Sequence, residues 1–209
     1  MLFAGFICLL MAFGGQLIAQ SYSQSQVDSL EIESARQPAD SLSLSANLRL
    51  GRYYLERDLG KATYFYNNAL DISDSLGIVK RKATALNGLA SIHEKLNNYG
   101  KAIEYVLQSI EYRKAAKDTA GLQWGYSTLA SLYSERGMYD EAYKAMDESD
   151  RYVSYDYSLN QWFANRHNKT TFLSDEGKKE EARRILLENL QIARDSGLSD
   201  MHIAVTNNN

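Results

Sequence analysis

Four alanines recur along the chain at a constant spacing of 40 residues, at Ala62, Ala102, Ala142 and Ala182. A larger side chain follows four residues after each of them, in the order Tyr66, Val106, Met146 and Leu186. A fixed period of about 20 to 50 residues indicates an array of structural repeats. Such arrays build extended surfaces rather than enclosed clefts. The spacing therefore constrains the fold of this chain more than any other feature of its sequence.

Each repeat has the pattern of two antiparallel helices, which we call helix A and helix B. Helix A of repeat 2 has a mostly apolar face, with residues at i, i+3, i+4 and i+7. These are Leu86, Leu89, Ala90 and His93. A polar turn at Asn97 and Asn98 precedes helix B. The chain has one proline, Pro38, and this scarcity favours long uninterrupted helices. We therefore predict an all-α fold, an α-solenoid of antiparallel helix pairs.

Two of the four repeats depart from this pattern. Gly51 precedes Ala62 by 11 residues, whereas Ala90 precedes Ala102 by 12, so repeat 1 is expected to have a turn one residue shorter. Repeat 4 has Arg166, Lys169 and Thr170 where repeats 2 and 3 place apolar or small residues, so its helix A is predicted to be weak.

The sequence divides into three parts. Residues 1–19 are uncharged and mostly apolar and end in a small residue, Ala19, which indicates a cleaved signal peptide. The alternatives are an uncleaved membrane anchor and a buried helix. The signal peptide and the membrane anchor both place the rest of the chain outside the cytoplasm, in the periplasm or the extracellular space. Residues 20–42 form a polar lead-in, in which Val27, Leu30, Ile32 and Ala35 predict one amphipathic helix.

Residues 43–209 carry the four repeats and the start of a fifth. Residues 203–209 align three periods downstream of residues 83–89, which predicts a partial helix A at the end of the sequence. Since a solenoid needs a polar cap at each end, we interpret this as truncation of a longer parent sequence.

Composition and motifs exclude several classes of function. The formal net charge is −3 with no basic stripe, so we expect no binding to nucleic acid. Cys8 is the only cysteine, and His93, His167 and His202 lie in different repeats, so no metal site is predicted. The sequence has no phosphate-binding glycine loop, no nucleophile elbow and no His-Glu-x-x-His motif. We expect no catalytic residues and no cofactor, and therefore not an enzyme.

Aromatic and histidine positions favour packing over ligand binding. The tyrosines that recur in both helices, among them Tyr53, Tyr54, Tyr64 and Tyr66, suit helix–helix seams with the ring buried and the hydroxyl at the edge. His93 stands at a packing position and is expected to be a hydrogen-bonded core residue.

The repeat resembles the tetratricopeptide repeat (TPR). The matching residues are Leu89-Ala90, His93, Asn97, Tyr99, Ala102, Val106 and Ser109 in repeat 2, and Leu129-Ala130, Tyr133, Gly137, Tyr139, Ala142, Met146 and Ser149 in repeat 3. The resemblance implies a TPR-like superhelix over residues 43–209. The period of 40 exceeds the usual length of about 34, and no proline closes a unit. In these respects the chain is similar to the long-period repeats of exported sensor regions in Bacteroidetes signalling proteins.

The resemblance also implies where a partner would bind. In TPR arrays helix A lines the concave face, and the inward positions correspond here to Asn87, Ser91, Glu94, Lys95, Trp124, Ser127, Ser131, Glu135, His167, Thr171 and Asp175. The alternative is that these are solvated helix residues. Of the lysines, arginines and asparagines that a carboxylate-clamp TPR requires, only Asn87 and Lys95 fit, so that specialised function is not expected.

We consider three hypotheses of function. The first is an exported scaffold that binds a protein or peptide partner of unknown identity, with the membrane involved only if residues 1–19 stay attached. The second is the sensory region of a truncated signal-transduction protein, either a histidine kinase or a DNA-binding regulator. A cryptic enzyme is the third and least supported.

Overall fold

The computed structural model describes residues 22–36, 38–152 and 159–195, and these parts of the chain are helical throughout apart from turns. The predicted signal peptide and the predicted fifth helix lie outside the described residues. The chain divides into two compact units, residues 1–125 and 126–209. No helix of the described ranges is both long enough and apolar enough to span a membrane.

The helices follow one another with short connections. Those of the first unit are α1 (Gln24–Ser34), α2 (Ser41–Tyr54), α3 (Leu59–Ser75), α4 (Val79–Lys95) and α5 (Tyr99–Ala115). The boundary between the units falls within α6 (Thr119–Glu135), which is followed by α7 (Tyr139–Asp150), α8 (Leu159–Asp175) and α9 (Lys179–Asp195).

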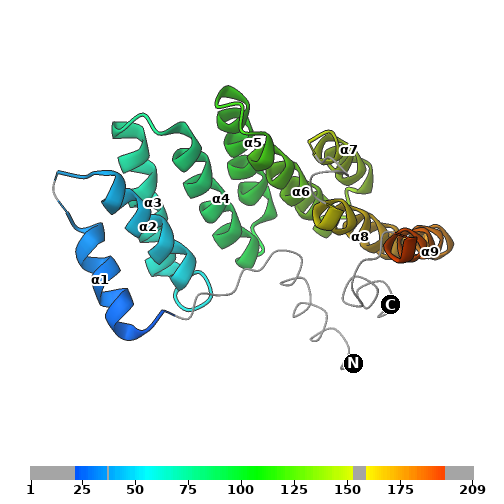
Figure 1. Ribbon diagram of the computed structural model, residues 1–209, viewed down its shortest axis with the longest axis horizontal. Coiled ribbons are helices and arrows are strands. Elements are labelled where there is room, and N and C mark those ends of the chain that lie inside the picture. Colours follow the sequence, from blue (N-terminus) through cyan, green and yellow to red (C-terminus); the bar gives the residue numbers. More distant parts are fainter. Residues whose placement is uncertain (1–21, 37, 153–158, 196–209) are drawn as a thin grey trace. The chain divides into compact units, whose positions relative to one another are not determined.

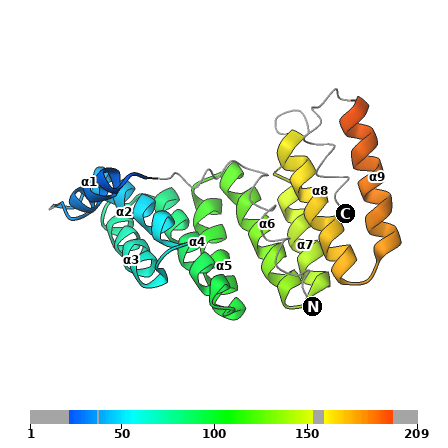
Figure 2. The ribbon, with the colours of Figure 1, turned by 90° about the horizontal axis from the view of Figure 1, so that it is seen from below.

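The described packing contacts are mainly between helices that are neighbours in the sequence. In the first unit α1 to α5 contact one another in chain order, and α2 also contacts α4 across one helix pair. In the second unit α7 packs on α8 and α8 on α9. Figure 1 and Figure 2 show α2, α3, α4 and α5 side by side. This order of contacts is that of a helical solenoid, which confirms the predicted fold class.

The four alanines occupy the positions that the period predicts. Ala62, Ala102 and Ala142 are fully buried and Ala182 is 2% exposed. Each lies in the first turn of a helix B, where only a small side chain allows a close approach to the preceding helix A. The register derived from the alanine spacing is therefore confirmed.

Left-handed residues end the A helices at the same place in three repeats. Asn97, Gly137 and Gly177 stand 40 residues apart and have φ angles of 55°, 69° and 91°. Glycine and asparagine tolerate this conformation better than other residues do. Repeat 1 has Arg57 at the corresponding position, which has no such tolerance.

The turn of repeat 1 corrects one prediction. Four residues, 55–58, separate α2 from α3, whereas three residues, 96–98, separate α4 from α5. The turn is therefore one residue longer rather than shorter. The additional turn residue comes from the end of helix A, since α2 ends at Tyr54 and leaves Leu55 as its C-cap.

The lead-in helix forms, but its buried face is narrower than predicted. Val27 and Leu30 pack with Leu50 and Phe65, so α1 covers the first helix pair. Ile32 is 74% exposed, and Ala35 is an exposed C-cap residue. The prediction that these two share the apolar face is wrong, because eleven helical residues offer only three turns of contact.

Helix A of repeat 4 is not weak, since α8 has 17 residues like α4 and α6. Its packing face is built from Phe163, Phe172 and Leu173, which are 3–8% exposed and lie two periods after Ala83, Ile92 and His93. Arg166 turns its side chain toward α9, where its Nη2 lies 2.8 Å from a carboxylate oxygen of Glu188.

A tyrosine ring fills the space between two successive A helices. Tyr66 is 5% exposed. A Cβ added at Gly51 on α2 would lie 2.9 Å from its ring, and a Cβ at Gly88 on α4 would overlap the ring. Burial raises the pKa of the Tyr66 hydroxyl to about 12.

This burial predicts a loss of stability at alkaline pH. The phenol ionises near pH 10 in the unfolded chain but only near 12 in the folded one, so the unfolded state is favoured as pH rises from 10 towards 12. We expect Tyr66→Phe to lose less stability than the wild type over this interval, because phenylalanine fills the same space without ionising. Urea unfolding at pH 9, 10 and 11 measures the difference. Parallel pH curves for the two proteins would contradict it.

Candidate partner-binding site

Helix α4 carries one accessible stripe along a side that does not pack in the core. The predicted residues Asn87, Ser91 and Glu94 are half-buried and Lys95 is exposed. They recur at intervals of three and four residues and so share one side of the helix. The residues that alternate with them are buried, namely Ala83, Ala85, Leu86, Gly88, Leu89, Ala90 and Ile92.

The stripe ends at an ion pair with the unusual turn of repeat 1. Lys95 Nζ lies 2.8 Å from Glu56 Oε2, and the two side chains are 37% and 61% exposed. A pair this exposed contributes little stability, but it joins the end of α4 to the α2–α3 turn.

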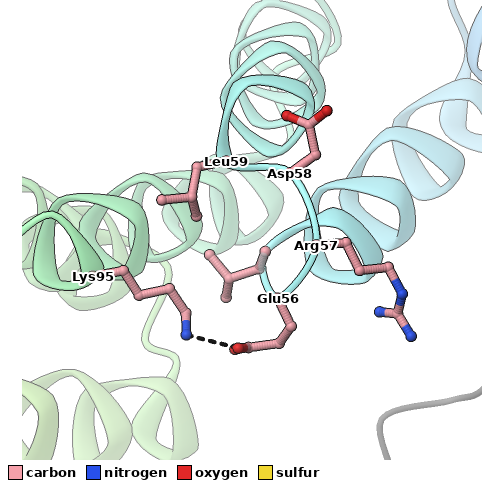
Figure 3. A pocket seen from close by; sticks show the side chains of 6 residues that line it. Glu56, Arg57, Asp58, Leu59 and Lys95 are labelled. Carbon is pink, nitrogen blue, oxygen red and sulfur yellow. Dashed lines mark hydrogen bonds and ion pairs between the residues drawn. The ribbon is translucent and has the colours of Figure 1, made fainter.

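A depression of about 350 Å³ surrounds this pair, lined by Leu55, Glu56, Arg57, Asp58, Leu59 and Lys95. Figure 3 shows Glu56 and Lys95 meeting across it, whereas Arg57 points away. The lining combines leucine side chains with a neutralised charge pair, which suits contact with a peptide side chain. Sequence reasoning missed Glu56, because only the displaced turn brings it to Lys95.

Two of the predicted residues hold polar atoms that lack a hydrogen bond. Asn87 Oδ1 and His167 Nδ1 are buried and have no hydrogen-bond partner. The two residues stand two periods apart, at the same place of their repeats. Burial lowers the pKa of His167, which favours its neutral form. An unmade hydrogen bond of a buried group costs about 1–3 kcal/mol, so both atoms would gain from a hydrogen bond once their side chains rotate toward the surface.

Trp124, in the first unit, is 49% exposed on α6. It already interacts with a neighbour, so any partner would contact a side chain that is already held in place. Its large exposed aromatic surface has the character of an interface anchor.

The remaining predicted residues lie on α6 and α8 in the second unit. Ser127 is only 8% exposed and its Oγ accepts a hydrogen bond from Asn168 Nδ2 at 3.4 Å. Ser131 is half-buried and donates to the Ser127 carbonyl at 3.3 Å, and the half-buried Thr171 donates to the His167 carbonyl at 3.3 Å. The exposed carboxylates are those of the two helix ends, Glu135 and Asp175.

His93 differs from the prediction for it. The side chain is half-buried, its Nδ1 has no hydrogen-bond partner, and its ring stacks on Tyr105 at a centroid distance of 5.5 Å. It is therefore held by an aromatic contact rather than by a core hydrogen bond at Nδ1. In the described ranges no group of three or more histidine, cysteine or acidic side chains is placed to bind a metal ion.

Comparison with known proteins gives one distant similarity. No family model matches the chain. An alignment of 106 residues is 29% identical to tetratricopeptide repeat protein 29 of Trypanosoma brucei brucei (strain 927/4 GUTat10.1) and covers 47% of this chain. It spans 22% of that protein. Together with the paired helices, this similarity fits a TPR-like protein and suggests a repeat scaffold for protein interaction.

Proposed function

We propose that this chain is an exported TPR-like scaffold that binds a peptide segment of a protein partner through the accessible side of its A helices. The observation that carries the proposal is the stripe on α4. It carries Asn87, Ser91, Glu94 and Lys95 along one side of α4, half-buried or exposed, whereas most of the residues between them are buried.

The chemistry of the stripe supports a peptide rather than a small apolar ligand. It offers an amide, a hydroxyl and both signs of charge within about two and a half turns of helix. The unbonded Oδ1 of Asn87 supplies an acceptor for a backbone N–H. Since the Asn87 side chain is only half-buried, a rotation about its side-chain bonds would present this atom to a partner.

A peptide-binding assay tests this proposal. An array of random peptides is probed with the wild type, and the captured peptides are then measured against Asn87→Ala and Trp124→Ala. We expect each substitution to weaken binding by about tenfold or more, as for interface residues that contribute about 1.4 kcal/mol or more.

The matched control is Leu107→Ala. Leu107 is 43% exposed on a B helix, α5, away from the stripe, so its truncation is expected to leave peptide affinity unchanged. Equal affinities for all four proteins would remove the assignment of the A helices as the binding surface.

The export part of the proposal comes from the apolar segment at residues 1–19. Expression of the full chain with a periplasmic fractionation, followed by sequencing of the mature N-terminus, tests it. Cleavage after Ala19 is the expected result. The sensory alternative is tested separately, by whether the reading frame continues beyond codon 209 into a transmembrane stretch and a kinase or DNA-binding domain.

A further inference from the structure

A network of aromatic rings lies where α1, α2 and α3 meet, at the start of the first unit (Figure 1). Tyr22 and Tyr53 approach edge to face at 5.9 Å, and Tyr53 does the same with Tyr54 at 4.9 Å. Tyr54 stacks on Phe65 at 5.6 Å, and Phe65 contacts Tyr64 at 5.2 Å. We call these five residues, with the cations that lie on them, the aromatic–cation surface.

Three cations lie over three of the five rings. The guanidinium of Arg57 lies 4.1 Å from the ring centroid of Tyr53, and that of Arg49 lies 5.2 Å from Tyr22. Lys61 Nζ lies 4.7 Å from the Tyr54 ring. At these distances the ring faces attract the charges and hold them in place.

The three cations differ from most others in the described part of the chain, because none of them is within ion-pair distance of a carboxylate there. Arg57 donates to the Tyr53 carbonyl at 2.7 Å, and Arg49 Nε donates to the Tyr22 hydroxyl at 3.1 Å. A guanidinium has five N–H donors, so both retain donors for a ligand.

The nearby acidic groups are already engaged. Glu31 accepts a hydrogen bond from the Tyr54 hydroxyl at 2.9 Å, and Asp58 accepts one from the backbone N–H of Lys61 at 3.0 Å. Glu56, next to Arg57 in the sequence, is paired with Lys95. Apart from that pair, the surface has three cations against two carboxylates, in a chain whose formal net charge is −3. This local excess of positive charge is opposite in sign to that of the whole chain.

The aromatic–cation surface is also accessible. Arg49, Arg57 and Lys61 are exposed, and Tyr64 is 61% exposed. The prediction that the tyrosines are buried in seams therefore fails for Tyr64. Exposed aromatic rings and arginines are the residue types enriched in interfaces.

We propose that the aromatic–cation surface binds an acidic peptide segment that carries aromatic or aliphatic side chains. The guanidinium groups of Arg49 and Arg57 would each take a carboxylate, and Lys61 a third, by charge-assisted hydrogen bonds. The apolar side chains of the segment would pack on Tyr64 and Tyr53. This surface uses none of the residues of the α4 stripe. Arg57 also lines the depression around Lys95 and Glu56, but its side chain points away from that pair, so the surface would be a second binding site beside the first.

The test uses the full chain and a fluorescein-labelled peptide that alternates aspartate with phenylalanine. The variant carries Arg49→Gln, Arg57→Gln and Lys61→Gln together. The matched control carries Arg81→Gln, Lys117→Gln and Lys144→Gln, three exposed cations outside the surface that change the net charge by the same amount. Circular dichroism establishes that both variants are folded, and fluorescence anisotropy measures affinity at two salt concentrations.

We expect the peptide to bind the wild type and the control alike, and the variant about tenfold or more weakly. The wild-type affinity should fall with salt, and the peptide with asparagine in place of aspartate should bind weakly to all three proteins. Equal binding to variant and control would overturn the proposal, as would no binding to the wild type. Capture by phosphatidylserine vesicles without binding of the peptide would also overturn it, in favour of a membrane surface.

Discussion

Replacing Arg113 with methionine is expected to lower the free energy of unfolding by about 3 kcal/mol, the lower end of the range for breaking a buried ion pair. Arg113 is 9% exposed at the end of α5. Its Nη1 donates to Asp118 Oδ2 at 3.1 Å, and its Nε donates to Ser109 Oγ at 3.1 Å. Burial lowers the pKa of the Arg113 guanidinium, and the neighbouring Asp118 opposes this shift.

The loss would exceed that of one hydrogen bond because the group ties together three segments. Ser109 Oγ in turn donates a hydrogen bond to the carbonyl of Ala83 on α4 at 2.9 Å. Asp118 also accepts from the backbone N–H of Gly121, in the first turn of α6. Methionine keeps the apolar stem of the side chain but leaves Asp118 without its closest cation, since Lys80 Nζ is 4.0 Å away.

Chemical denaturation followed by circular dichroism measures this effect. The control is Lys101→Met, which removes an exposed i,i+3 ion pair with Glu104 on the same helix and is expected to change stability little. In an Asp118→Asn background, Arg113→Met should cost less than it does alone, because the two residues act as one pair. Equal costs in both backgrounds would contradict the pairing.

Gly88→Ala is expected to lower the free energy of unfolding by about 2 kcal/mol, although alanine is intrinsically the better helix former by about 1 kcal/mol. The new Cβ would overlap the ring atoms Cδ1, Cε1 and Cζ of Tyr66. Since Gly51 bounds the same ring through α2, the ring has no free space to move into. Overpacking of this kind typically costs about 1–3 kcal/mol and occasionally more.

Gly100→Ala is the matched control for this substitution. Gly100 lies in the first turn of α5, and a Cβ there would meet nothing within 4 Å. It should therefore leave stability unchanged or raise it by up to about 1 kcal/mol. Replacing Tyr66 with leucine should relieve much of the cost of Gly88→Ala. If Gly88→Ala were as stable as the wild type, the placement of the Tyr66 ring between the two glycines would be wrong.

The predicted features that the structure confirms are those that recur with the period. Ala62, Ala102, Ala142 and Ala182 could be placed from the sequence because a small residue at a helix crossing is a local requirement that every repeat must meet. The helix-pair fold follows from the same spacing.

The features that could not be predicted occur once. Glu56 reaches Lys95 only because α2 ends early. The core of α8, in contrast, was predictable, because Phe172 and Leu173 lie two periods after Ile92 and His93. The prediction of a weak helix gave weight to Arg166, Lys169 and Thr170 instead. Ile32 was assigned to the wrong face because the spacing of apolar residues in a short helix is compatible with more than one buried face.

Tyr66 and its two flanking glycines have a consequence for the order of the repeats. One period after Gly88 the chain has Thr128, and one period later it has Asn168, both too large to receive an aromatic ring in this way. The residues one and two periods after Tyr66 are the non-aromatic Val106 and Met146. Repeats with the same length and the same pattern of alanines thus differ in the size of the residue at the Gly88 position. Repeat 2 can follow repeat 1 because Gly88 leaves room for the Tyr66 ring. A copy of repeat 3 or repeat 4 in its place would put Thr128 or Asn168 against that ring.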